Sequence, residues 1–85
     1  MKPDYKKVRD LAGEVDDIND SLHALEISDR LYLTGEETGR TTSMHRLGWV
    51  PDEVSASVKE LMEQVLKARR EALAKTIREE LNNED

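Results

Sequence analysis

The sequence predicts an all-α fold, an antiparallel helical hairpin in which two long helices are joined by a long loop. Apolar residues recur at helical spacing in two segments, about residues 3–33 and about residues 51–81. Charged residues make up 38% of the chain and aromatic residues only 4%, a profile typical of long solvated helices. At 85 residues the chain is long enough for a single domain, and we expect its last residues, 82–85, to fray.

The first segment carries a heptad-like apolar seam. Its apolar residues alternate at steps of three and four, and one more follows a heptad later: Val8, Leu11, Val15, Ile18, Leu22, Leu25 and Tyr32. This spacing is typical of a helix packed along another helix. Asp29 occupies a seam position, so we expect the packing to loosen there. Gly35 suits the residue just beyond the end of a helix.

The second segment begins with Pro51, which suits a first helical position, and its acidic first turn suits the positive end of the helix dipole. Its apolar stripe is wide: Val54, Val58, Leu61, Met62, Val65, Leu66, Ala68, Ala72, Leu73, Ile77 and Leu81. A wide stripe indicates contact with more than one neighbour. We therefore expect a homodimer that forms a four-helix bundle. Rop-like bundles are similar in architecture, and this likeness carries no function.

The connection from Thr34 to Val50 is long for a link between two helices, and such loops are commonly functional or disordered. An alternative is a short β-hairpin, with Leu31–Thr34 returning through Arg40–Thr42. Charge favours an antiparallel arrangement of the helices. The acidic residues Glu14, Asp16, Asp17 and Asp20 should lie level with Lys67, Arg69 and Arg70, and Lys6, Lys7 and Arg9 should approach Glu79 and Glu80.

Composition excludes several classes of function. The chain has no cysteine, so it can hold neither a disulfide nor a thiolate metal site. No apolar run approaches the length of a membrane span, and the N-terminus lacks the apolar region of a signal peptide, so we expect a cytoplasmic protein. Neither histidine, His23 or His45, has an evident nucleophile partner, and there is no phosphate-binding glycine loop. We expect neither an enzyme nor a bound cofactor.

Three charged patterns offer alternatives to a plain solvated surface. Asp20 and His23 have the spacing of a metal-binding pair, but a full site needs more carboxylates, so we expect no metal site. The acidic segments 14–17 and 60–63 resemble the Mg²⁺-gathering helices of helical nucleotide pyrophosphohydrolases, without that family's double-glutamate pattern. Five cations could form a nucleic-acid stripe, although the chain carries a net charge of −6: Lys67, Arg69, Arg70, Lys75 and Arg78.

The connection is the most informative candidate site. Four residues within ten positions are the types favoured as binding anchors or as charged contacts: Arg40, His45, Arg46 and Trp49. We predict that they bind another macromolecule, most readily a protein. The chain would then act as an adaptor, an inhibitor or an assembly factor. The alternative reading of Trp49 is a cap on the end of the helical core. The alternative binding surface is the acidic face of the first helix, formed by Asp16, Asp17 and Asp20. Alternative functions are a nucleic-acid-associated regulator and a Mg²⁺-dependent nucleotide phosphohydrolase.

Overall fold

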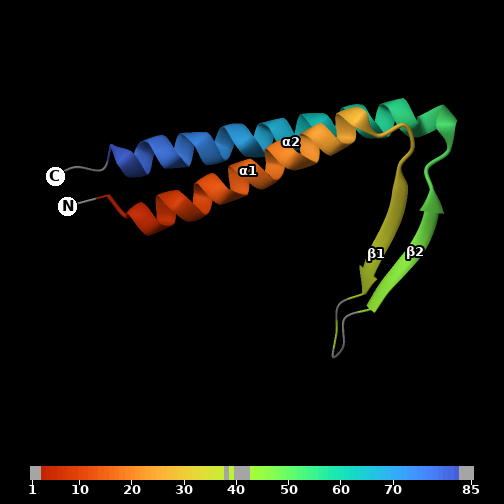
Figure 1. Cartoon of the computed structure of the whole chain (residues 1–85), viewed down its shortest axis with the longest axis horizontal. Helices are drawn as coiled ribbons and strands as arrows, with labels where there is room; N and C mark the ends of the chain where they lie inside the picture. Colours follow the sequence, from red (N-terminus) through yellow and green to blue (C-terminus); the bar gives the residue numbers. More distant parts are fainter. Residues whose placement is uncertain (1–2, 38, 40–42, 83–85) are drawn as a thin grey trace.

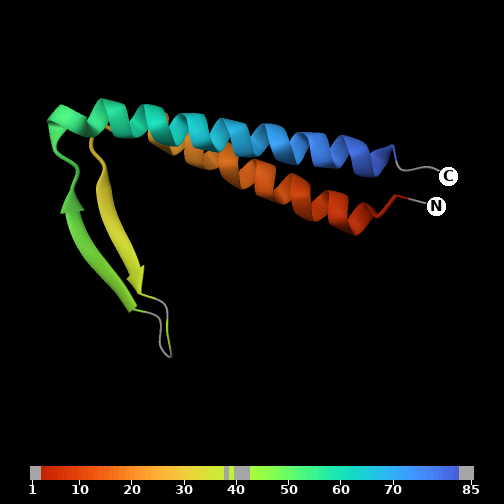
Figure 2. The same ribbon diagram turned by 180° about the vertical axis from the view of Figure 1, so that it is seen from behind.

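The computed structural model describes residues 3–37, 39 and 43–82. Its elements are helix α1 (Tyr5–Ile27), strand β1 (Tyr32–Glu37), strand β2 (Ser43–Trp49) and helix α2 (Asp52–Leu81). The two helices run side by side in opposite directions, and the β-hairpin projects from the end where α1 stops and α2 begins (Figures 1 and 2). The molecule measures 53 × 35 × 15 Å, so it is only about one helix thick.

The predicted all-α fold is wrong, because the expected loop contains a two-stranded antiparallel β-hairpin. The first helix ends at Ile27 rather than near residue 33. The reason lies in Ser28, whose backbone is extended and whose backbone N–H and hydroxyl both donate to the carbonyl oxygen of Ala24. After this cap and a short bend the chain enters β1 at Tyr32, so Tyr32 belongs to a strand and not to the heptad seam.

The alternative β-hairpin prediction places the first strand about correctly. The observed return strand is Ser43–Trp49, whereas the predicted Arg40–Thr42 lies outside the described residues. Gly35 does not end a helix; it pairs with His45 inside the sheet. A Cβ atom at Gly35 would lie 3.4 Å from the Leu47 side chain, so the glycine leaves room for that leucine.

The two long packed helices are confirmed. The seam residues of α1 from Val8 to Leu25 are at least half-covered, and Ile18, at its centre, is 6% exposed. From α2, the half-buried residues Val58, Leu66, Leu73 and Ile77 complete the contact. The helical core is therefore one line of side chains, and within the described part of the two helices only Ile18 is fully buried.

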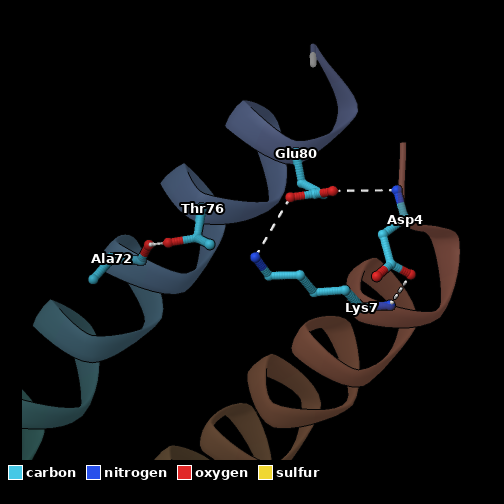
Figure 3. Close-up of polar contacts among 5 residues, drawn as sticks. All are labelled: Asp4, Lys7, Ala72, Thr76 and Glu80. Atoms are coloured by element: carbon cyan, nitrogen blue, oxygen red, sulfur yellow. Dashed lines mark hydrogen bonds and ion pairs between the residues drawn. The ribbon is translucent and has the colours of Figure 1, made fainter. Parts of the chain in front are cut away.

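Polar contacts confirm the antiparallel register that the charges predict. At the open end of the helical pair, the Lys7 amine lies 3.5 Å from a Glu80 carboxylate oxygen, and the other oxygen of Glu80 accepts from the backbone N–H of Asp4 (Figure 3). Asp4 in turn caps α1 by accepting from the Lys7 backbone N–H. Further along, Arg69 lies 3.9 Å from Glu14. Neither described helix is long and apolar enough to cross a membrane.

Candidate functional site

The hairpin is held by a ladder with one irregularity. Tyr32 pairs with Trp49 at its base and Glu37 with Ser43 near its tip, and the register shifts between Leu33 and Thr34. The shift adds one residue to β2, as in a β-bulge. Gly48 lies beside the bulge with a φ of +119°, a backbone conformation that residues other than glycine rarely adopt.

Alternation along the strands gives the hairpin an aromatic face, which we define as Tyr32, Thr34, Glu36, Met44, Arg46 and Trp49. At its base the rings of Tyr32 and Trp49 meet edge to face, with centroids 4.9 Å apart. Arg30 lies on the short segment that leads into β1, and its guanidinium is 4.2 Å from the centroid of the Trp49 ring. Cation–π and aromatic contacts together hold these three side chains in a defined arrangement.

The aromatic face stays open to solvent despite these contacts. Trp49 is 55% exposed, Tyr32 is 42% exposed and Met44 is 66% exposed. Trp49 therefore does not cap the helical core, and that reading of the sequence is wrong. A tryptophan ordered by neighbours and still half exposed is a surface feature suited to contact with another molecule.

The opposite side of the hairpin, here the leucine face, consists of Leu33, Gly35, Glu37, Ser43, His45 and Leu47. Leu33 is 49% exposed and Leu47 is 65% exposed. His45 Nε2 lies 3.0 Å from a carboxylate oxygen of Glu37, an exposed contact across the two strands. This face is less aromatic and is partly occupied by that polar pair.

Neither face is covered by the helices. In the described part of the chain, the hairpin strands contact each other and the helices contact each other, with no packing between strand and helix. The hairpin joins the helices through a short base, where the Val50 backbone N–H donates to the Leu31 carbonyl oxygen and Val50 itself is buried. The hairpin is thus an arm that extends from the helical pair (Figure 1).

The structure separates the predicted site residues. His45, Arg46 and Trp49 all lie on β2, but Arg46 and Trp49 are on the aromatic face and His45 is on the leucine face. Arg40 lies outside the described residues. Sequence reasoning missed Arg30 and Tyr32, because both were placed in the first helix. The signal that could have found them is the polar break Ser28-Asp29-Arg30 followed closely by the β-favouring Tyr32.

The alternative acidic face remains an exposed part of α1. Asp16, Asp17 and Asp20 are all exposed, and none of them takes part in the ion pairs seen among the described residues. The described residues contain no group of three or more histidine and carboxylate side chains close enough to hold a metal ion. The acidic face therefore offers charge without a defined pocket.

An open groove of about 560 Å³ runs between the helices and brings opposite charges together. It is lined by Asn19, Leu22, His23, Leu25, Glu26, Lys59, Glu63, Lys67 and Arg70. Its cations have partners within the chain: Lys59 donates to the Ser28 carbonyl oxygen, Lys67 to Glu63 and Arg70 to Asn19. Lys59 and Arg70 thus link α2 to the α1 side of the groove through neutral acceptors, whereas Lys67 pairs with a carboxylate of its own helix.

The chain matches no protein-family model, no curated protein and no solved structure with which it was compared. The functional argument therefore rests on the geometry of the hairpin and of the two helices.

Proposed function

We propose that this protein is a non-enzymatic binding protein whose β-hairpin docks on an apolar surface of another protein through its aromatic face. The observation that supports the proposal most directly is the exposure of that face on an arm that no other described element covers. A two-stranded hairpin alone is marginally stable in water. A partner that covers the arm would both bury apolar surface and stabilise the hairpin.

The composition of the aromatic face also favours a protein partner. Tryptophan, tyrosine and arginine are the residue types most enriched among side chains that dominate binding energy. Here the ring of Trp49 already contacts both Tyr32 and Arg30, the residue just before the aromatic face, in the free chain. Because their arrangement is set before binding, less side-chain entropy is lost when the partner docks. The helical pair then serves as the platform from which the arm extends.

Partner capture with two matched variants tests the proposal. The aromatic-face variant carries Met44→Ser and Trp49→Ser, and the leucine-face variant carries Leu33→Ser and Leu47→Ser. Each removes two large exposed apolar side chains from the same hairpin. Wild type and both variants are immobilised, incubated with extract of the source organism and compared by quantitative mass spectrometry. The partner is then purified and its affinity for each form is measured.

We expect the wild type and the leucine-face variant to capture the same protein, and the aromatic-face variant to lose it. Loss of a central tryptophan contact costs about 2 kcal/mol or more, which corresponds to an affinity about 30-fold weaker. The single substitution Met44→Ser leaves the contacts of Trp49 with Arg30 and Tyr32 intact and should weaken binding by a smaller factor. Equal capture by all forms, or loss only in the leucine-face variant, would contradict the proposal.

A further inference from the structure

Helix α2 carries a second apolar stripe that α1 leaves exposed except at Val58, which is half-buried and belongs to both contacts. We call it the outer stripe; its members follow one another at alternating steps of four and three: Val54, Val58, Leu61, Val65, Ala68 and Ala72. Leu61 is 61% exposed, Val65 is 54% exposed and Val54 is 45% exposed. Steps of three and four are the spacing of a helix packed along a partner helix. The outer stripe therefore has the spacing of a helix-packing seam, and no described element covers most of it.

The hairpin leaves this seam accessible. In both views of the molecule the hairpin lies on the same side of α2 as α1 does, and it extends from the N-terminal end of α2 (Figures 1 and 2). The strands make no packing contact with α2 in the described residues.

Charges along α2 indicate what covers the seam. The helix begins with Asp52 and Glu53, and its C-terminal half carries the exposed cations Lys75 and Arg78 together with the exposed carboxylates Glu71 and Glu79. The residues that flank the centre of the outer stripe are uncharged, namely Ser57, Met62 and Gln64. A second copy of α2 running antiparallel would bring Lys75 of each copy beside Asp52 and Glu53 of the other at both ends of the contact, while Arg78, Glu79 and Glu80 would lie beyond it. A parallel copy would set like charges side by side, which is unfavourable.

We infer that the outer stripe is the contact for a second copy of this chain, with the two α2 helices antiparallel. The spacing defines one register, in which Leu61 lies opposite Val65 of the other copy, Val58 opposite Ala68, and Val54 opposite Ala72. In this register Lys75 lies level with Pro51 of the other copy and beside its Asp52 and Glu53. Arg69 and Glu71 fall beside the uncharged Ser55 and Ser57, so no like-charge pair forms along the seam.

This dimer also fixes where the two arms lie. Each arm is attached at the start of α2, and in the register above the two starts are separated by the span from residue 51 to residue 75. At 1.5 Å per residue, this span is about 36 Å. The dimer thus presents two hairpins at opposite ends of one helical platform. That consequence rests on the proposed function of the hairpin, whereas dimerisation itself does not.

Sedimentation velocity of the full chain over a range of micromolar concentrations tests the inference. We expect a monomer–dimer equilibrium for the wild type. The substitutions Leu61→Glu and Val65→Glu should weaken dimerisation at least a hundredfold, because they place like charges opposite one another in the seam. Both side chains are exposed in the single chain, so helical circular dichroism should be retained. Tyr5→Glu, another exposed apolar position, is the matched control and should dimerise normally.

Charge exchange tests the orientation of the two helices. Glu53→Lys alone should weaken the dimer, and adding Lys75→Glu to it should restore the affinity to near the wild-type value. A wild-type chain that stays monomeric throughout the concentration range would overturn the inference. A dimer that persists in the Leu61→Glu and Val65→Glu variant would show that the outer stripe is not the dimer contact. If adding Lys75→Glu to Glu53→Lys does not restore the dimer affinity, the antiparallel register is wrong. None of these readouts involves the hairpin's partner.

Discussion

Replacement of Ile18 by alanine tests the helical pairing most sharply, because the same helix contains a matched control. Ile18 is 6% exposed at the centre of the contact, whereas Ile27, at the end of α1, is 65% exposed. Ile→Ala removes three carbon atoms, and at about 0.8 kcal/mol for each buried carbon this predicts a loss of about 2.4 kcal/mol at Ile18. Alanine's better helix propensity returns about 0.4 kcal/mol, so the net loss is about 2 kcal/mol.

Thermal unfolding followed by circular dichroism at the helical minimum measures this loss. For a domain of this size, 1 kcal/mol shifts Tm by about 4–8 °C, so Ile18→Ala should lower Tm by about 8–16 °C. Ile27→Ala should leave Tm nearly unchanged, because little buried surface is lost and the helix propensity improves. Equal shifts in the two variants would refute the assignment of Ile18 to the core and with it the pairing of α1 and α2.

Three further outcomes follow from the structure. Gly48→Ala should disrupt the hairpin, at a local cost of about 1–3 kcal/mol from its backbone conformation, and changed amide chemical shifts of β1 and β2 would show this. The Tm of the helices, measured by circular dichroism, should stay constant. Fluorescence from Trp49 should be red-shifted and readily quenched by acrylamide, and a blue-shifted, protected emission would place it in a core. Glu80→Gln should cost at most about 1 kcal/mol in low salt and less in high salt, because its pairing with Lys7 is partly exposed; an equal effect at both salt concentrations would argue against the ion pair.

The helical pair could be predicted from the sequence because its signals are local and agree with one another. The steps of three and four from Val8 to Leu25 gave the seam and placed Ile18 near its centre. The opposite charges on the two segments gave the register now seen in the contacts of Glu80 with Lys7 and of Arg69 with Glu14. The seam depends only on helical periodicity, and the register depends only on which charged clusters lie at the same height along two antiparallel helices.

The hairpin was harder to predict because its sequence conceals the alternation of a strand. Leu47 is the extra residue of the bulge, so the apolar and polar positions of β2 fall out of step. Gly35 and Gly48 within the strands weaken the β signal, and Tyr32 stands one heptad after Leu25, which extends a helical pattern by coincidence. The aromatic face depends on the register of two strands, and this register is not visible in either strand alone.

The role of the aromatic face is tested most directly by a photoreactive amino acid placed at single positions of the chain in its source cell. The reactive side chain is introduced at Met44 on the aromatic face, at Leu47 on the leucine face, or at the exposed Glu60 on α2. After irradiation, mass spectrometry identifies the protein joined at each position. We predict one abundant adduct with another protein from Met44 and little from Leu47 or Glu60. Adducts from Leu47 or Glu60 with none from Met44 would contradict the claim that the aromatic face is the binding surface.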